Sequence, residues 1–334
     1  MSQRSTLPGF AIAADIGGTN MRAALVTRDG KVSHRNVCPT NPDAGIEDGS
    51  ARLAALISTA LDAAGIPTVV GLGIATAGPL DPATGVYNHP PNLQAWHGKT
   101  MKPLLERDLR MPVWIGHDAT LAAFAETQAG PHKGARDLIY VTISTGIGGG
   151  IIANGEMVTG STGGAGEMGH FAVRPGAQRC NVGCDGCFEG NACGPAIVKM
   201  AAARIAAGGR SRLTEMAGGN PSRITPKMVI EAAAAGDGLA GSVVDTVIDN
   251  IGIGLAGLLN IFDPEALVIG GGVVEGLRPQ FERVRASVMS HALPRYRDAG
   301  GVPVSITTLG DDVSLLGAAF LAFRKTGAGE GGQR

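Results

Sequence analysis

The sequence predicts an α/β fold made of two similar domains. Its 334 residues fit two domains better than one. Strand-like apolar runs alternate with helical patterns along the chain, which is typical of α/β architecture. Each half of the chain opens with the same order of elements: strand, glycine turn, strand, two-residue turn, strand. This repetition indicates an internal duplication.

The first half consists of apolar runs separated by turns and helical segments. The expected strands are 10–17, 21–27, 32–37, 69–77 and 113–116. Helical patterns predict helices at 46–65, 102–110 and 119–128. Asp29-Gly30 is a hairpin turn signal before the third strand, and Asp81-Pro-Ala-Thr-Gly marks another turn.

The second half begins in the same way. A strand at 138–145 leads into Gly146-Ile-Gly-Gly-Gly and a strand at 151–153, followed by an Asn154-Gly155 turn. The later elements expected are helices at 195–207, 226–235, 239–262 and 314–325, and strands at 266–269 and 302–308. Gly252, Gly254 and Gly257 form a Gly-x-Gly-x-x-Gly inside a helical pattern, so we interpret them as close helix packing and not as dinucleotide binding. The domain boundary is expected within residues 117–137.

Composition and charge narrow the class of protein. The 28 Lys and Arg nearly balance the 29 Asp and Glu, and no basic stripe occurs. This argues against nucleic-acid and anionic-membrane partners, which need clustered cations. No apolar run reaches eighteen residues, and Asp15 interrupts the only apolar patch near the N-terminus, so neither a membrane span nor a signal peptide is predicted. We expect a soluble cytoplasmic protein.

Two glycine-rich turns at strand ends suggest a nucleotide site. The first is Asp15-Ile-Gly17-Gly18-Thr19-Asn20, whose backbone N–H groups and Thr19 can cradle phosphate oxygens. Asp15 is placed to meet the Mg²⁺ that accompanies phosphates. Alone, this turn is equally well explained as a glycine hairpin. A second glycine-rich turn at a corresponding strand end favours the nucleotide site over the hairpin interpretation. Its candidate residues are Thr145, Gly146, Gly148 and Gly149. Neither turn has the Gly-x4-Gly-Lys-Ser/Thr pattern.

A cysteine-rich loop supplies the ligands of a structural zinc. Cys180, Cys184 and Cys187 lie within eight residues, and His170 lies ten residues before the first of them. Three thiolates and an imidazole complete a closed tetrahedral zinc site. Structural zinc contributes about 10–16 kcal/mol, against about 1–2 kcal/mol of backbone entropy per residue, so one ion holds about ten loop residues. A disulfide or chance clustering are the alternatives.

Three further polar residues stand at places where ligands bind in α/β proteins. His117 and Asp118 follow a strand end and precede a helix. Asp118 can be a general base, although a lone Asp at this place is more often a helix N-cap. His117 alone is more often structural than catalytic. Pro90-Pro91-Asn92-Leu93, followed by Trp96, is a rigid turn that offers one amide and one aromatic ring, or simply a surface loop.

Taken in order, these motifs resemble the ROK family of sugar kinases and repressors, and within it the bacterial glucokinases. The resemblance covers roughly residues 10–325 and is most specific at Glu167-x-Gly-His170 and the cysteine loop ending in Glu189. It implies two ribonuclease H-like α/β domains in the actin-like arrangement of sugar kinases and heat-shock ATPases, with a cleft between them. The N-terminal domain would comprise residues 1–118 plus a returning helix at about 312–326, and the larger C-terminal domain residues 119–311 with the zinc loop.

The resemblance also implies roles for individual residues. Asp118 would be the catalytic base, and the sugar hydroxyls would be bound by Asn92, His117, Asp118, Glu167, His170 and Glu189. ATP would be held by Asp15, Gly17, Gly18, Thr19, Asn20, Thr145, Gly146, Gly148 and Gly149, with Gly270, Gly271 and Gly272 on the adenosine side. Structural zinc would be held by His170 and the three loop cysteines. The family further suggests a homo-oligomer, a dimer or tetramer.

The sequence departs from the family pattern at three places. Val182 occupies the place of the family's second loop cysteine, and Cys184 lies two residues further on. The usual Asn-Asp dipeptide is His117-Asp118, and the usual Pro-Gly-Pro is Ala77-Gly78-Pro79. The first departure bears on the zinc geometry and the second on sugar specificity.

The function expected from these residues is ATP-dependent phosphorylation of glucose at its 6-hydroxyl. A kinase for N-acetylmannosamine, N-acetylglucosamine, fructose or allose is the nearest alternative, kept open by His117. A sugar-responsive transcriptional repressor is the alternative from another class. Only fourteen residues precede Asp15 in this sequence, which is too short for a winged helix-turn-helix, so that alternative is disfavoured.

Overall fold

Two five-stranded sheets with the same strand order form the framework of the protein. The computed structural model describes residues 9–65, 68–298, 301 and 304–327. The first sheet has the order β3-β2-β1-β4-β5 and contains β1 (Phe10–Ile16), β2 (Asn20–Thr27), β3 (Val32–Pro39), β4 (Leu72–Thr76) and β5 (Val113–His117). The second has the order β10-β9-β6-β7-β8 and contains β6 (Leu138–Ile143), β7 (Ile147–Ala153), β8 (Glu156–Met157), β9 (Ala266–Gly270) and β10 (Val304–Ile306). Since β3-β2-β1-β4-β5 and β8-β7-β6-β9-β10 correspond strand for strand, the duplication predicted from sequence is confirmed in the topology.

Strand register in the first sheet brings three strand ends to one edge. β1 is antiparallel to β2 but parallel to β4, and β4 is parallel to β5. Ile16 is in register with Thr76, and Thr76 with His117. The residues that follow these strands, Gly17 and Asp118 among them, therefore emerge at the same edge. The carboxyl edge of parallel strands is where α/β proteins bind ligands.

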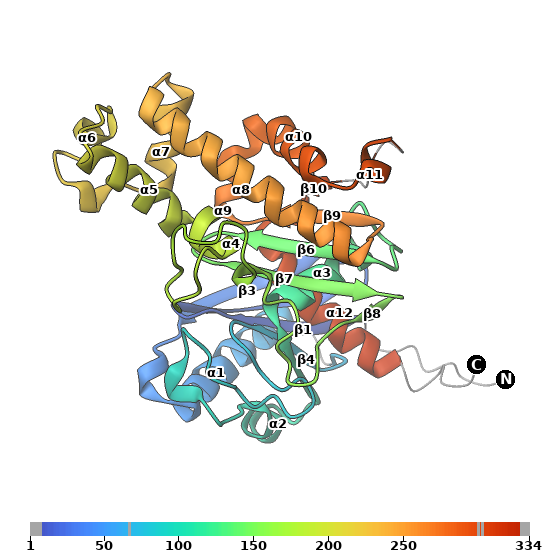
Figure 1. Cartoon of the computed structure of the whole chain (residues 1–334). Helices are drawn as coiled ribbons and strands as arrows, with labels where there is room; N and C mark the ends of the chain where they lie inside the picture. The colour runs from blue at the N-terminus through green and yellow to red at the C-terminus, as the bar shows by residue number, and fades with distance from the viewer. Residues whose placement is uncertain (1–8, 66–67, 299–300, 302–303, 328–334) are drawn as a thin grey trace. The chain divides into compact units, whose positions relative to one another are not determined.

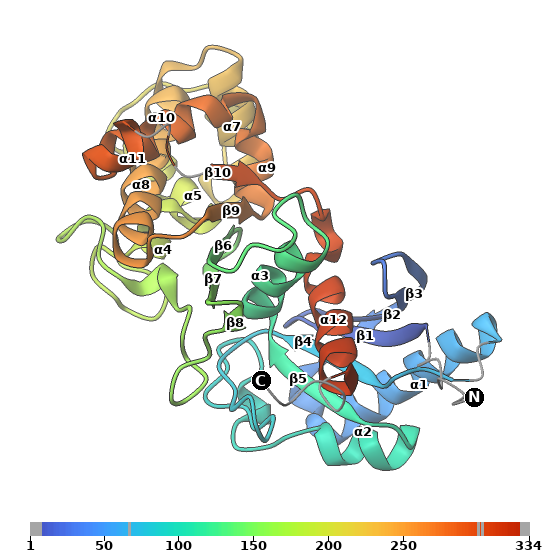
Figure 2. The same cartoon turned by 90° about the vertical axis from the view of Figure 1, so that its right-hand side faces the viewer.

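Helices cover both faces of the first sheet (Figures 1 and 2). α1 (Ile46–Ala64) and α2 (Lys102–Leu109) pack on one face, and α3 (Asp118–Gln128) and α12 (Val313–Gly327) on the other. α12 lies unusually close to the sheet, because a Cβ on Gly73 would stand 1.8 Å from the Ala318 carbonyl oxygen. Gly317 meets Leu121 of α3 with similar closeness. Small residues thus fix the last helix of the chain onto the first sheet.

The second sheet is accompanied by a helical region built around one long helix, α8 (Gly238–Phe262). The other helices of this region are α4 (Phe188–Ala192), α5 (Gly194–Ala206), α6 (Leu213–Met216), α7 (Pro226–Ala234), α9 (Gly272–Leu277), α10 (Phe281–His291) and α11 (Pro294–Asp298). A Cβ on Gly252 would collide with Ser287 of α10, and one on Gly254 with Phe188 of α4. The interpretation of this glycine pattern as close helix packing is confirmed.

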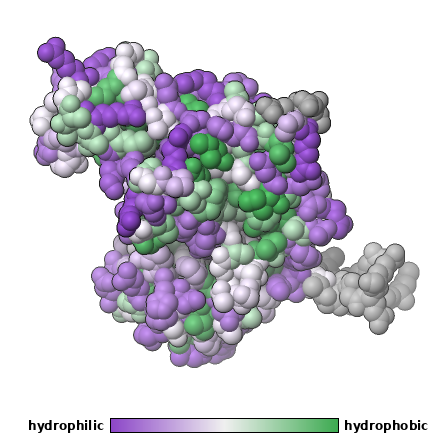
Figure 3. All heavy atoms as spheres, in the orientation of Figure 1, coloured by the Kyte–Doolittle hydropathy of each residue, from purple (hydrophilic) through white to green (hydrophobic). Residues whose placement is uncertain are grey.

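α8 is also the one described helix that is long and apolar enough to cross a membrane. Polar residues and glycines interrupt its sequence, so it contains no continuous apolar run of eighteen residues. Of its most apolar window, 67% is buried inside the protein, as expected for a core helix. Ile261 and Phe262, at its C-terminal end, are exposed. The face in Figure 3 is a mosaic of hydrophilic and hydrophobic residues.

Contacts divide the chain into two units that differ from the expected domains in their boundaries. The first unit runs to Gly134 and includes Glu156–Ala165 and the segment from Thr308 onward; the second comprises Ala135–Gly155 and Gly166–Thr307. The change of unit at 134–135 lies within the expected range of 117–137. The finer boundary after residue 118 separates α3 from the first unit, whereas in the structure α3 packs on α12 and belongs to it. The return of the last helix to the first unit is as the family resemblance implies.

One segment predicted as a glycine loop is a strand in the structure. Gly148, Gly149 and Gly150 were expected in a glycine loop, but they lie in β7, opposite Thr142, Val141 and Tyr140 of β6. The turn itself is only Ser144-Thr145-Gly146. A Cβ on Gly149 would stand 2.3 Å from the sulfur of Met168, so this glycine serves packing. The expected final strand included residues 302 and 303, which lie outside the described residues.

Candidate active site

The turn after β1 is held by hydrogen bonds and leaves two polar residues exposed. The Gly17 N–H donates to the Asn20 carbonyl (3.0 Å). Thr40, which follows β3, donates its hydroxyl to the Gly17 carbonyl (2.6 Å) and its N–H to the Thr19 carbonyl (2.8 Å). Thr19 and Asn20 are exposed. Thr40, which was not among the predicted site residues, therefore braces the turn and leaves the Thr19 and Asn20 side chains exposed.

Asp15, one residue before the end of β1, is held by an arginine. Arg22 of β2, its register partner, donates to Asp15 Oδ2 from Nε (3.1 Å) and Nη2 (2.5 Å), and also donates to the Asp311 carbonyl (2.9 Å). Burial raises the pKa of Asp15 against the lowering effect of Arg22, and the negative charge of Asp118 adds to the rise. With Oδ1 left for a cation, Asp15 fits a single-oxygen role toward Mg²⁺, which usually keeps several waters. Arg22 was missed because its position beside Asp15 depends on strand pairing.

Asp118 begins α3 directly after β5. The structure places His117 at the N-cap position, so the interpretation of Asp118 as the N-cap is wrong. Asp118 Oδ1 accepts a hydrogen bond from the Ala119 N–H (2.6 Å), and His117 Nε2 lies 3.3 Å from the same oxygen. The Asp118 side chain remains 36% exposed, which leaves it accessible to a substrate. His117 Nδ1 is buried without a hydrogen-bond partner among the described residues.

The loop that carries Asn92 is anchored by buried aromatics and touches the first turn. Trp96 is fully buried, and its Nε1 donates to the Pro42 carbonyl (3.1 Å), so it anchors the loop and does not face a ligand as the sequence analysis allowed. Asn92 is exposed. A Cβ on Gly18 would stand 2.8 Å from Asn92 Cβ. The structure thus brings together the first turn and Asn92.

The turn after β6 borders a large cavity in the second unit. The Ser144 N–H donates to the Gly146 carbonyl (2.9 Å), and its carbonyl accepts from Gly194 (2.7 Å). The cavity measures about 830 Å³ and is lined by Thr145, Gly272 and apolar residues including Val198, Ile230 and Val273. This is within the range of small-molecule sites. Of the three consecutive glycines at the end of β9, Gly270 and Gly271 pack tightly on Tyr140 and Ile143, and Gly272, which begins α9, lines the cavity.

The Glu-Met-Gly-His segment adjoins the same turn. Gly169 and Met168 pack against β7, since a Cβ on Gly169 would stand 2.3 Å from the Ile147 carbonyl oxygen. This packing leaves Glu167 exposed and places its Oε2 3.8 Å from His170 Nε2. Glu189 Oε2 accepts a hydrogen bond from the Ile147 N–H (2.9 Å). Two carboxylates and one imidazole are therefore positioned around β7.

The loop cysteines gather around the other nitrogen of His170. Cys180 Sγ and Cys184 Sγ each lie 3.8 Å from His170 Nδ1. The donor atoms of His170, Cys180 and Cys187 all lie within 4.8 Å of one another. All five cysteines are free, so the disulfide alternative is not formed. Gly183 (φ 92°) and Gly186 (φ 58°) provide the left-handed backbone that turns Cys184 inward.

Three of the four expected donors, on His170, Cys180 and Cys187, are close enough together to share one zinc ion, and Cys184, outside this group, approaches it through its 3.8 Å distance to His170 Nδ1. With zinc–sulfur bonds of about 2.3 Å and zinc–nitrogen bonds of about 2.0 Å, neighbouring ligand atoms stand about 3.5–3.8 Å apart. Burial opposes ionisation of Cys180, but hydrogen bonds from the Cys184 and Val182 backbone and from neighbouring thiols lower its pKa to about 7. Cys193 is buried outside the cluster, and burial raises its pKa to about 11. A metal ligand is therefore expected among the loop cysteines and not at Cys193.

Comparison with known proteins identifies the family to which the sequence is similar. The sequence matches the profile of the ROK family over residues 11–325. It is 33% identical over 328 residues to a glucokinase of Halalkalibacterium halodurans (96% of this chain, 97% of the relative) and 31% identical over 316 residues to a glucokinase of Thermotoga maritima (95% and 98%). A ROK family glucokinase from Streptomyces griseus, solved in complex with glucose and AMPPNP, superposes with a TM-score of 0.78 at 31% identity, covering 95% of this chain and 100% of that one.

The actin-like α/β fold and these relatives define an ATP-dependent sugar kinase. The family profile covers nearly the whole sequence, and the repeated sheets, the Glu167-x-Gly-His170 segment and the cysteine loop are all in place. The chain belongs to the ROK family.

Proposed function

We propose that this kinase transfers the γ-phosphoryl group of ATP to the 6-hydroxyl of glucose. The observation that carries the sugar site is the grouping of Glu167, His170 and Glu189 around β7, since hydroxyl-rich ligands need several charged or neutral acceptors close together. Glucose as the sugar is supported by the glucokinases of comparable length and by the glucose complex of the Streptomyces griseus enzyme.

Asp118 is the general base in this proposal. Its carboxylate accepts the proton of the 6-hydroxyl as that oxygen bonds to the γ-phosphorus. The bond between the γ-phosphorus and the bridging oxygen breaks, and ADP leaves with the electron pair. Asn92, His117, Glu167, His170 and Glu189 bind the remaining hydroxyls and hold the sugar. Positioning of this kind accounts for most of the catalysis in phosphoryl transfer.

The nucleotide is bound by residues of both turns. In the first unit these are Asp15, Gly17, Gly18, Thr19 and Asn20; in the second, Thr145 and Gly146, with the purine in the cavity lined by Gly272. Gly149, Gly270 and Gly271 act through packing, and Gly148 lies in β7 opposite Thr142. Asp15 would hold the Mg²⁺ that neutralises phosphate charge. Structural zinc on His170, Cys180, Cys184 and Cys187 would fix the imidazole for the sugar. We also propose that the protein is cytoplasmic and forms a dimer or tetramer.

A coupled ADP-release assay tests the sugar. The panel consists of glucose, N-acetylmannosamine, N-acetylglucosamine, fructose and allose, with 6-deoxyglucose as a control that lacks the acceptor oxygen. The highest kcat/KM is expected for glucose, and 6-deoxyglucose should inhibit without turnover. A higher kcat/KM for another member of the panel would replace glucose by that sugar. A different preferred sugar is the second candidate function. It rests on His117, which lies beside the proposed base Asp118 at the position where the family usually has Asn.

His117→Asn is expected to change KM for the sugar and leave kcat within about threefold. An imidazole and an amide both donate and accept, but in different directions, and one hydrogen bond changes affinity by about 2- to 10-fold. The panel assay measures the change, including any new ranking of sugars. His34→Asn, at an exposed position whose φ of 50° suits Asn, is the matched control. KM values unchanged across the panel contradict a sugar contact at His117.

Gly18→Ala is expected to raise KM for the sugar by about tenfold. The new methyl group collides with Asn92, and overpacking of this kind costs about 1–3 kcal/mol. Gly17→Ala is the control in the same turn, because its Cβ would meet only the Asn20 carbonyl oxygen at 3.4 Å. Steady-state kinetics of both variants distinguish the collision with Asn92 from the effect of any added methyl group in this turn. Equal sugar KM values in the two variants would show that the Gly18–Asn92 contact does not position the sugar loop.

A further inference from the structure

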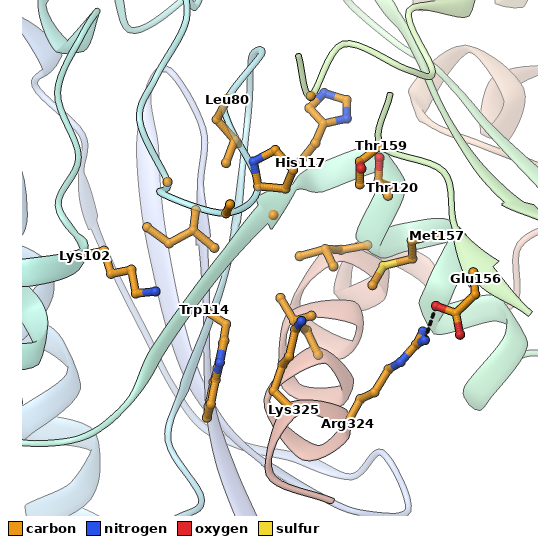
Figure 4. Close-up of a pocket in the computed structure, with 18 residues that line it drawn as sticks. Leu80, Lys102, Trp114, His117, Thr120, Glu156, Met157, Thr159, Arg324 and Lys325 are labelled. Atoms are coloured by element: carbon orange, nitrogen blue, oxygen red, sulfur yellow. Dashed lines mark hydrogen bonds and ion pairs between the residues drawn. The ribbon is translucent and has the colours of Figure 1, made fainter. Parts of the chain in front are cut away.

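The first unit contains a cavity that the proposed kinase reaction does not use. It measures about 490 Å³ and lies between β5, the ends of α2 and α12, and the segment that follows β8. Of the residues assigned to sugar or nucleotide, only His117 lines it. In Figure 4 the His117 ring points away from Lys102, Trp114 and Lys325. Apart from His117, the cavity is thus separate from the groups that would bind glucose and ATP.

The charges around the cavity favour an anion. Its lining carries three cations, Lys102, Arg324 and Lys325, and a single carboxylate, Glu156. Arg324 forms an ion pair with Glu156, drawn as a dashed line in Figure 4. Lys102 and Lys325 have no ion-pair partner among the described residues. Two lysine charges are therefore left for a ligand.

The rest of the lining suits a small organic group bearing hydroxyls. Trp114 is half-buried in β5, and in Figure 4 Lys102 and Lys325 lie to either side of its indole. Thr120 and Thr159 add hydroxyls to the wall. An aromatic face stacks well on the apolar face of a carbon skeleton, and hydroxyl and ammonium donors suit phosphate oxygens. The volume is that of a small-molecule site.

We propose that this cavity binds a small phosphate ester such as a sugar phosphate. The phosphate dianion pairs with Lys102 and Lys325, which between them match its charge. The carbon skeleton packs on Trp114, and the threonine hydroxyls bind its polar groups. Because β5 forms one wall and ends at His117, the ligand contacts the strand that positions Asp118.

Intrinsic fluorescence provides a direct test, because the chain has only two tryptophans. Trp96 is fully buried, whereas Trp114 lines the cavity. The probe is glucose 6-phosphate, titrated without nucleotide and at saturating glucose, which suppresses binding of the ester at the sugar site. We expect a saturable change in wild type that Trp114→Phe abolishes, and weaker binding of inorganic phosphate than of the ester.

The lysine variants decide whether the signal comes from the cavity. Lys102→Gln and Lys325→Gln should each weaken binding of glucose 6-phosphate by about 5- to 10-fold, since each loses a partly screened charge-assisted hydrogen bond. Lys99→Gln is the control, because Lys99 pairs with Glu47 (3.6 Å) and does not line the cavity. Both cavity variants should keep wild-type kcat and KM in the kinase assay.

The following results would overturn the proposal: no saturable signal in wild type, a signal retained in Trp114→Phe, equal affinities in wild type and both lysine variants, or equal affinities for inorganic phosphate and the ester. The titration contains no nucleotide and measures binding alone. Only the block of the sugar site depends on glucose, so the Trp114 and lysine variants, which leave that site unchanged, distinguish failure of this proposal from failure of the proposed sugar preference.

Discussion

Replacing Asp118 by Asn is expected to lower kcat by about 10²–10⁴ while the protein stays folded. The amide keeps the shape of the carboxylate and its oxygen can still accept from the Ala119 N–H, but it cannot take a proton. KM for the sugar should change far less than kcat, because the hydrogen-bonding position remains filled. Steady-state kinetics with the preferred sugar, together with a thermal melt, measure both expectations.

Asp108→Asn is a suitable control for this variant. Asp108 is an exposed carboxylate of the same unit, paired with Arg107 on the surface of α2, and its loss should leave kcat unchanged. A near-wild-type kcat in Asp118→Asn would assign the base elsewhere. A parallel fall in the melting temperature would instead attribute the lost activity to folding.

Cys184→Ser should lose most of the zinc that the wild type carries. About one zinc per chain is expected in freshly purified wild type, because under the proposal His170 and three thiolates would close the coordination shell. With one ligand removed, the shell opens, and brief chelation should then strip the metal. Metal analysis before and after chelation gives the result, and the melting temperature should fall with the zinc content.

Cys193→Ala is the matched control for the zinc experiment. Cys193 is buried near the same loop but outside the cluster, so its replacement should leave the zinc content unchanged. Equal retention of zinc in wild type and Cys184→Ser would exclude Cys184 as a ligand. Absence of zinc from freshly purified wild type would show that the loop is held by its hydrogen bonds and glycine turns alone.

Much of the fold could be predicted because its signals are local. β1 and β2, α1, α5 and α7 were each expected within one or two residues of their observed ends, since strand and helix periods are visible in short windows. The repeated opening of each half predicted an internal duplication, and the two sheets share their strand order. α9 and α10 were missed, because short or mixed segments have weak periodicity and depend on packing against α8.

The sequence by itself determined the α/β class, the two glycine turns at strand ends, and which side chains were candidates for the site. The tertiary structure decided which candidates are packed in the interior and which remain exposed at the ends of strands. Gly149 is a strand residue under Met168, Trp96 is a core anchor, and Arg22 holds Asp15 across a strand pair. These outcomes depend on strand register or on contacts between residues far apart in sequence. The periodicity of one segment shows which of its faces is buried, but it does not identify the residues that this face packs against.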